Sequence, residues 1–408
     1  KARALLIFTA AAMAVPAAAF AQPAQAPTRQ AAMAPSVPTG PSDADLPMQS
    51  IEVVSSVSSN HTATIKGQRV PYTVTAGTYP VFGADGKPVA SLFHTYYKRT
   101  DVKDSATRPL LISFNGGPGS ASVWMHIAYT GPKSLEIDDE GFPIQPYGVR
   151  DNPHSVLDVA DILYVDPVNT GFSRIIGGAD RAQFFGVNED VQYLARWIDG
   201  FVGREGRWRS PKFLIGESYG TTRVAGLVAQ LQNAHWMFFN GVILVSPTDL
   251  GLTRVGPTDD AMTLPYYAAA AWYHKALPAD LQARDLDALL PEVEQYTIDT
   301  YMPALTRAGS LSAEQRRQIA ERVSRYTGIK PEVVLDNNLV MSTQFFWKEL
   351  LRDQGKTIGR LDSRYTGINR ADAGQNPDFD PALTSWNHSF APGINYYLRD
   401  VLGYKTNL

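Results

Sequence analysis

The stretch FLIGESYG, residues 213–220, decides the fold of this chain. Residues 213–215 are apolar and predict the end of a buried strand, and residues 221–231 predict a helix. The turn between them is a Gly-x-Ser-x-Gly pentapeptide, in which a side chain at either glycine would clash in so sharp a bend. A serine there has its hydroxyl pushed out above a sheet, beside the N-terminus of the helix. This context favours Ser218 as a nucleophile over an ordinary tight turn without a catalytic role.

Composition bounds the class of protein. The chain has 408 residues, 44% of them hydrophobic and 19% charged, enough for one large domain or a domain with a substantial insertion. The formal net charge is -3 without a long run of one sign, which gives no argument for a nucleic-acid partner. The lack of cysteine excludes disulfides and thiolate metal sites. No His-Glu-x-x-His or other metal-ligand spacing occurs, so neither a metal nor a cofactor is expected.

Residues 1–21 have the pattern of a secretory signal peptide. Lys1 and Arg3 are positive, an alanine-rich apolar segment follows, and Ala21 closes a small-x-small cleavage site. The alternative is an uncleaved membrane anchor, but the segment is short and contains a proline, so stable membrane insertion is not expected. Residues 22–47, rich in Ala, Pro, Gln and Ser, predict a disordered linker. We expect an exported protein, periplasmic or extracellular, and the lack of cysteine favours a bacterial periplasm.

The folded sequence reads as an α/β core followed by a helical insertion. Within the core, 48–256, a small antiparallel start over 51–97 precedes short apolar runs that alternate with helical sequence. The runs cover 109–114, 161–165, 212–215 and 241–246, and Asn188 is the predicted cap of a helix between the second and third. Such alternation predicts a mostly parallel sheet covered on both faces.

Residues 257–392 lack the regularly spaced strand-like runs of the core, and their sequence predicts an inserted helical lid. The helices are expected at 261–277, 279–290, 312–326 and 343–354, and aromatic residues are frequent in them. Most of these rings are expected to be ordinary helical core, with a few lining a site. A further helix is predicted at 394–402, within the final segment 393–408.

A second glycine-rich motif, Asn115-Gly116-Gly117-Pro118-Gly119, follows the apolar run at 109–114. Its unobstructed backbone amides can point at an anion. A nucleotide-phosphate loop is the competing interpretation, but the chain has neither the Gly-Lys-Ser/Thr of a P-loop nor a complete dinucleotide fingerprint. In a serine hydrolase such a loop supplies one amide of the oxyanion hole, and the residue after the nucleophile supplies the other.

Three blocks of the chain together resemble the serine carboxypeptidase family of α/β-hydrolases. They are the glycine motif at 115–119, Asp-Pro-Val-Asn-Thr-Gly-Phe-Ser at 166–173, and the pentapeptide at 216–220. The likeness covers roughly 51–408 and is greatest to exported bacterial members without disulfides. It implies an α/β-hydrolase with a mostly parallel central sheet and an inserted helical lid.

Carried over residue by residue, the resemblance implies a role for each group of a carboxypeptidase site except the catalytic acid and histidine. Ser218 would be the nucleophile, and the amides of Gly117 and Tyr219 would form the oxyanion hole. The C-terminal carboxylate of a peptide would be held by three further groups: Asn115, the Gly116 amide and Glu217. The partners implied are therefore peptides with a free C-terminus.

Some positions depart from the family pattern or admit a second interpretation. Ser113 stands where a tryptophan is usual, Tyr129 where a second glutamate often joins the carboxylate network, and Ser120 where a cysteine is usual. Glu217 could instead be a buried hydrogen-bond partner without contact to substrate. Asp166, at the end of a predicted strand, is interpreted as structural because strand-end aspartates usually accept backbone hydrogen bonds.

No acid and base complete a triad after Ser218. Of the later histidines, His235 is too close to the nucleophile's helix and His274 lies inside a predicted lid helix. His388 follows Asp378 and Asp380 in the expected order, but too closely for the strand and helix that normally separate acid from base. The sequence therefore predicts a C-terminally truncated carboxypeptidase whose final strands, catalytic Asp and His lie beyond Leu408, and a fragment that is poorly soluble and nearly inactive.

Two other functions stay open on the sequence. An acyltransferase can use the same scaffold, because the two classes differ in whether water or an alcohol meets the acyl-enzyme. A catalytically inactive peptide-binding homologue would also carry these motifs. The preferred substrate side chain and the oligomeric state are not determined by the sequence.

Overall fold

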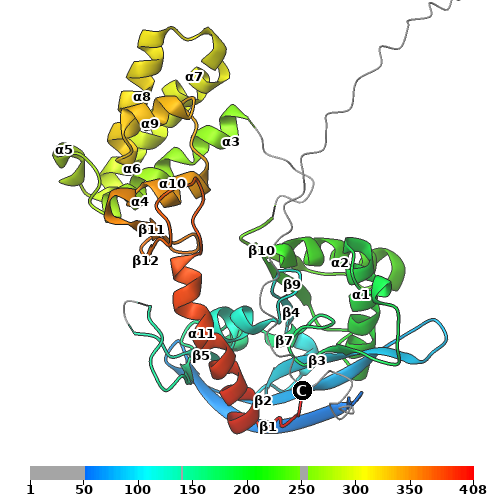
Figure 1. Ribbon diagram of the computed structural model, residues 1–408. Helices are drawn as coiled ribbons and strands as arrows, with labels where there is room; N and C mark the ends of the chain where they lie inside the picture. Colours follow the sequence, from blue (N-terminus) through cyan, green and yellow to red (C-terminus); the bar gives the residue numbers. More distant parts are fainter. Residues whose placement is uncertain (1–50, 139–140, 249–255) are drawn as a thin grey trace, which may run out of the picture. The chain divides into compact units, whose positions relative to one another are not determined.

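A computed structural model describes residues 51–138, 141–248 and 256–408, all within one unit, Ser50–Leu408 (Figure 1). The predicted signal peptide and the predicted linker lie outside the described residues. Among the described residues, no helix is both long and apolar enough to cross a bilayer.

The core is an eight-stranded sheet with the order β1-β2-β3-β7-β4-β9-β10, in which β8 also pairs with β3. The strands are β1 Ser55–Ile65, β2 Gln68–Phe82, β3 Pro88–Arg99, β4 Leu110–Phe114, β7 Asp161–Val165, β8 Arg174–Ile175, β9 Lys212–Glu217 and β10 Gly241–Val245. The first three are antiparallel neighbours, whereas β7, β4, β9 and β10 are parallel. The predicted antiparallel start and mostly parallel centre are therefore confirmed.

Successive side chains along the central strands point alternately to the two faces of the sheet, and each face has its own apolar core. On β7, Leu163 and Val165 join one apolar cluster with helices α1 Val187–Arg204 and α2 Tyr219–His235. Ile162 and Tyr164 join the other. That second face is covered by a helical turn, Met125–Thr130, and by α11 Pro381–Tyr396 with its continuation Tyr397–Val401. Both faces are covered because a parallel sheet is apolar on both sides.

Two predicted helix starts are wrong. Helix α1 begins at Val187 after Gly186, whose carbonyl accepts the 2.9 Å hydrogen bond from Asp190, so Asn188 lies inside the helix rather than capping it. The last long helix begins at Pro381 rather than at residue 394. Asp380 caps it by accepting a 3.1 Å hydrogen bond from the amide of Ala382.

The helical segment has its own apolar core, which runs from Ala261 to Ile358. Its helices are α3 Pro257–Met262, α4 Leu264–Tyr273, α5 Ala279–Gln282, α6 Leu286–Tyr296, α7 Met302–Thr306, α8 Ala313–Thr327, α9 Pro331–Asp336 and α10 Thr343–Glu349. Helix α8 matches the predicted range 312–326 within one residue, whereas the helices predicted at 261–277, 279–290 and 343–354 are shorter or divided. A small hairpin follows, formed by β11 Lys356–Ile358 and β12 Thr366–Ile368. Helix α11 crosses the predicted boundary at residue 392, and its Phe390 and Ile394 pack against the core of the sheet.

Strand β10 is an uncovered edge within the described residues. It pairs with β9 on one side, and Val242, Ile243 and Leu244 are 38%, 45% and 50% exposed. Consecutive residues of a strand point to opposite faces, so side chains on both faces of β10 are partly exposed among the described residues. The two central strands β4 and β7, by contrast, are buried at every position.

Candidate active site

Ser218 stands at the turn between β9 and α2 with φ 55° and ψ -125°. Left-handed backbone is uncommon for a residue with a Cβ, and it clusters at functional turns. A Cβ on Gly216 would lie 2.1 Å from the carbonyl oxygen of Gly220, and one on Gly220 would lie 3.0 Å from the carbonyl oxygens of Phe114 and Asn115. The predicted strand, sharp turn and helix are confirmed, and both glycines are explained by contact.

The glycine loop after β4 packs directly against this turn. A Cβ on Gly116 would lie 2.6 Å from the amide nitrogen of Tyr219 and 2.8 Å from the Cβ of Ser218. The next Cα along a trans peptide is about 3.8 Å away, so Gly117 is close to the same contact. Gly117 has φ +107°, a conformation that only glycine adopts readily. The glycine loop and the Ser218 turn therefore meet in the structure.

Asn115 and Glu217 form the polar side of this meeting point. The side-chain nitrogen of Asn115 donates a 3.1 Å hydrogen bond to Glu217. Its side-chain oxygen accepts a 3.0 Å bond from the amide of Met125, which fixes the NH2 group toward the glutamate. Asn115 is buried and Glu217 is partly exposed. The glutamate thus has one anchored oxygen and an open side.

Tyr129 lies close enough to this pair to sense its charge. Burial and the negative charge of Glu217 both raise the pKa of the Tyr129 phenol. The tyrosine therefore keeps its proton at neutral pH and stays uncharged beside the carboxylate. The other departure from the family pattern, Ser113, is buried, and its hydroxyl has no hydrogen-bond partner among the described residues.

None of the seven histidines, all within the described residues, forms a hydrogen bond with Ser218. The three that follow the serine contact other groups: His235 pairs with Asp199 at 3.0 Å, His274 bonds the carbonyl of Ser363 at 2.6 Å, and His388 packs against the ring of Tyr147. The two aspartates before His388 also have other contacts, since Asp378 accepts from the amide of Arg370 and Asp380 caps α11. The structure does not bring these groups to Ser218.

Asp166 accepts a backbone hydrogen bond, as the sequence predicted for a strand-end aspartate. The donor is the amide of Ser122, at 2.8 Å. The carbonyl of Asp166 accepts a second bond from the hydroxyl of Ser173 at 2.7 Å. Burial raises the pKa of the Asp166 carboxyl to about 6. Asp166 therefore ties the second sequence block to the loop that follows the glycine motif.

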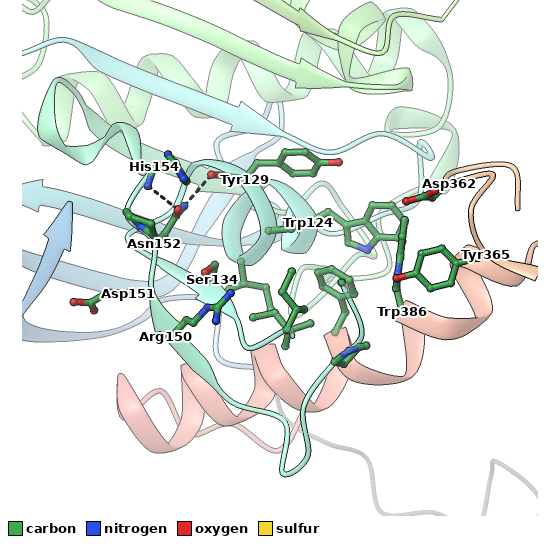
Figure 2. Close-up of a pocket in the computed structure, with 18 of the residues that line it drawn as sticks. Trp124, Tyr129, Ser134, Arg150, Asp151, Asn152, His154, Asp362, Tyr365 and Trp386 are labelled. Atoms are coloured by element: carbon green, nitrogen blue, oxygen red, sulfur yellow. Dashed lines mark hydrogen bonds between the residues drawn. The ribbon is translucent and has the colours of Figure 1, made fainter. Parts of the chain in front are cut away.

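A cavity of about 730 Å³ opens beside Tyr129 (Figure 2). Aromatic rings from distant parts of the chain line it: Trp124, Tyr129, Tyr365, Trp386 and Phe390. Trp124 stacks on Phe390 with ring centres 5.5 Å apart, and Tyr365 meets Trp386 edge-on at 5.3 Å. Asp362 and Arg364 also line the cavity and form an ion pair at 2.6 Å. Such a chamber suits an apolar or aromatic group.

Sequence reasoning missed most of these lining residues. Trp386 and Phe390 both lie on α11, one helical turn apart on the same face. The repeat of apolar residues at 386, 390 and 394 was the available signal, but the helix was predicted to begin at its last member. Trp124 could not be recognised because its partner, Phe390, is far away in the sequence.

Fold and site together define a class. A mostly parallel sheet between helical layers, with a serine on a sharp strand-to-helix turn and a glycine loop against it, is the arrangement of an α/β-hydrolase. A sequence model of the serine carboxypeptidase family matches residues 71–329, more than half of the chain. The protein belongs to the serine carboxypeptidase family and has its α/β-hydrolase fold.

Curated relatives share the family over part of their length. Serine carboxypeptidase-like 36 of Arabidopsis thaliana is 28% identical over 187 residues, which is 44% of this chain and 36% of the relative. Serine carboxypeptidase-like 28 of the same plant is 27% identical over 205 residues, 49% of this chain and 41% of the relative. The chain thus spans between about a third and two fifths of these relatives.

Among solved structures, one similar chain is a prohormone-processing carboxypeptidase, Kex1, from Saccharomyces cerevisiae. It is 18% identical, with a TM-score of 0.38, over 63% of this chain and 53% of the other. A hydrolase from Rhodococcus is 13% identical with a TM-score of 0.29, over 57% of this chain and 69% of the other.

Proposed function

We propose that this protein contributes a serine carboxypeptidase site, which removes C-terminal residues from peptides through an acyl-enzyme on Ser218. The observation that carries the proposal is the contact of the Gly116 loop with the Ser218 turn, beside the Asn115–Glu217 pair. One set of groups suits the reacting carbonyl, and the other suits the free carboxylate that defines an exopeptidase substrate.

The chemistry assigned to these groups is acyl transfer. The Ser218 oxygen attacks the scissile carbonyl while its proton passes to a general base, and the carbonyl oxygen becomes an oxyanion. The amides of Gly117 and Tyr219 stabilise that charge, each by about 3 kcal/mol in comparable sites. The proton then goes to the leaving amine, the C–N bond breaks, and water later hydrolyses the ester. The described residues place no histidine against Ser218, so the chain by itself should turn over slowly.

Glu217 gives the substrate carboxylate a pH-dependent partner. Two carboxyl groups side by side repel each other unless they share a proton. Asn115 already bonds one oxygen of Glu217, which leaves the other free to share a proton with a peptide's terminus. Binding of peptide acids should therefore be favourable in acid and weaken once both groups are ionised.

The aromatic cavity supports an apolar substrate end. Because Tyr129 both lines the cavity and senses Glu217, a peptide whose carboxylate meets Glu217 can place its terminal side chain between Trp124 and Trp386. We expect peptides ending in phenylalanine to bind more tightly than those ending in glycine. Trp386→Ala should remove that preference, whereas Trp208→Ala, at a half-exposed ring outside the cavity, should keep it.

The proposal is tested by comparing peptide acids with their C-terminal amides. Binding is followed by calorimetry on the Ser218→Ala protein, so that turnover does not interfere. Tighter binding of the acid, lost in Asn115→Ala, supports the carboxylate site. Equal binding of acid and amide would refute it.

A non-catalytic peptide-binding role is the second candidate. It is favoured by one observation, namely that none of the histidines bonds Ser218. Labelling of Ser218 by a fluorophosphonate separates the two, because the reagent reacts rapidly only with an activated serine. Acyl transfer to an alcohol instead of water would be detected as ester product. We also propose export of the protein, which mass spectrometry would detect as a mature chain beginning at Gln22.

A further inference from the structure

A fully buried arginine lies behind the glycine loop. The guanidinium of Arg223, on α2, donates to the carbonyl oxygen of Asn115 at 2.8 Å and to that of Pro118 at 3.2 Å. Its third hydrogen bond goes to the carboxylate of Asp190 at 2.7 Å. The two side chains are 1% and 8% exposed. The Arg223 guanidinium thus bonds the residues on both sides of the Gly116-Gly117 pair. Arg223 itself lies on α2, the helix that begins directly after Ser218.

Asp190 extends the contact to the second sequence block. Its other oxygen accepts a 3.2 Å hydrogen bond from the hydroxyl of Tyr193, and that hydroxyl accepts a 3.1 Å bond from the amide of Val168. The network Arg223–Asp190–Tyr193 therefore touches all three blocks that identified the family. The sequence showed Asp190 only as an acid in the first turn of a helix, and Arg223 only as one residue of a helix.

The bond to Asn115 orients an amide that matters for substrate. In a trans peptide unit the C=O and the following N–H point in opposite directions. Because the carbonyl of Asn115 points toward Arg223 on α2, the amide N–H of Gly116 points away from Arg223. The Gly116 carbonyl in turn accepts a 3.2 Å bond from the amide of Ser120, which aims the Gly117 amide. Arg223 holds the ends of the loop, and the Ser120 bond holds its middle.

We propose that Arg223 is a positioning residue that, with Asp190, holds the amides of Gly116 and Gly117 in the geometry for a peptide carboxylate and an oxyanion. The planar guanidinium of an arginine suits this position, because one side chain donates at once to the carbonyls of Asn115 and Pro118 and to the carboxylate of Asp190. A lysine supplies the charge but cannot span those three acceptors. The effect of Arg223 on substrate binding rests on the proposed function, whereas its hydrogen bonds to the glycine loop do not.

The chain offers a matched control. Arg207 is also fully buried and bonds Asp161 at 2.6 Å and a backbone carbonyl, that of Arg108, at 2.9 Å. Asp161 is the first residue of β7, whereas Ser218 follows the last residue of β9. In a parallel sheet these are opposite ends. Arg207→Lys and Arg223→Lys therefore make the same chemical change at opposite edges of the sheet.

The first experiment is hydrogen–deuterium exchange on the whole chain. Arg223→Lys should speed exchange of the peptide covering 115–120 by about tenfold, the value of one lost hydrogen bond. Arg207→Lys should leave that peptide as in the wild type. Unchanged exchange in Arg223→Lys, or equal opening by Arg207→Lys, would overturn the proposal. If Arg223→Lys does not fold, Tyr193→Phe removes one hydroxyl of the network and should open the same loop to a smaller degree, while unchanged exchange would count against it.

The second experiment measures binding of a peptide acid and its amide to each variant. Arg223→Lys should reduce the preference for the acid by about tenfold, and Arg207→Lys should keep it. If the wild type does not distinguish acid from amide, the proposed function fails while the exchange result still decides the role of Arg223. If the preference survives in Arg223→Lys although the loop has opened, its role in positioning the substrate is refuted.

Discussion

At the scale of single residues, the site is built from backbone rather than from side chains. The left-handed Ser218, the positive φ of Gly117 and the close approach of Gly116 to Tyr219 let two loops share one small space. The two glycine positions are defined by what a Cβ would meet, and Ser218 by its positive φ. Substitutions there should therefore affect chemistry more than folding.

Gly116→Ala tests this directly. Its Cβ would be placed 2.6 Å from a backbone nitrogen, which must push the loop away from Ser218. We expect the reactivity of Ser218 to fall by about 10²–10³, as for the loss of an oxyanion donor. Labelling by a fluorophosphonate measures it. The control is Gly119→Ala in the same motif, where a Cβ would meet nothing within 4 Å; equal losses in the two variants would contradict the steric explanation.

The pH dependence of substrate binding is also a property of one residue. If Glu217 shares a proton with the peptide terminus, the Michaelis constant for peptide acids should rise once both carboxyl groups are ionised. Glu217→Gln should flatten that rise because an amide carries no charge. Amidated or ester substrates should lack it in both proteins. A wild-type profile that survives in Glu217→Gln shows that the glutamate is only a structural hydrogen-bond partner.

At the scale of elements, the residues of the proposed site follow the ends of the central strands. β4, β7 and β9 run parallel and end at the same edge, followed by Asn115, Asp166 and Ser218. The side chains of Asn115 and Asp166 are held by hydrogen bonds to neighbouring loops. Asp166 is the member whose burial has a measurable consequence.

Asp166 should make stability fall as the pH rises. Its folded-state pKa is raised from 3.8 to about 6, so the folded protein binds this proton more tightly than the unfolded chain. The free energy of unfolding should therefore decrease between about pH 4 and pH 6. Asp166→Asn should remove that decrease, because the amide oxygen still accepts from Ser122 without a charge. Urea denaturation at pH 4, 5, 6 and 7 measures it; parallel curves for the two proteins would count against the assignment.

At the scale of the whole molecule, the central sheet ends in two edge strands within the described residues, β1 and β10. Strand β1 is polar along most of its length, whereas β10 pairs there only with β9 and presents three partly exposed apolar residues. Edges of this kind pair readily with other chains. Solubility should therefore be set at β10 rather than in the two cores.

Ile243→Lys should reduce self-association of the 408-residue chain at little cost in stability, because the side chain is already 45% exposed. Its neighbour in the pairing register, Ile215, is 5% exposed, and the same substitution there should unfold the protein by burying a charge. Sedimentation velocity and thermal denaturation compare the two. Undiminished association in folded Ile243→Lys would mean that another surface is responsible.

The sequence alone determined the α/β class, the positions of the central strands and the sharp turn at Ser218, because these depend on local apolar runs and on glycines that no other residue can replace. It missed the starts of α1 and α11, where Gly186 occupies the cap position and the side chain of Asp380 caps the helix. It also missed the hold of Arg223 on the glycine loop and the pairing of Trp124 with Phe390. Only the tertiary structure decided those, since they join residues that are far apart in the chain and leave no periodic trace in it.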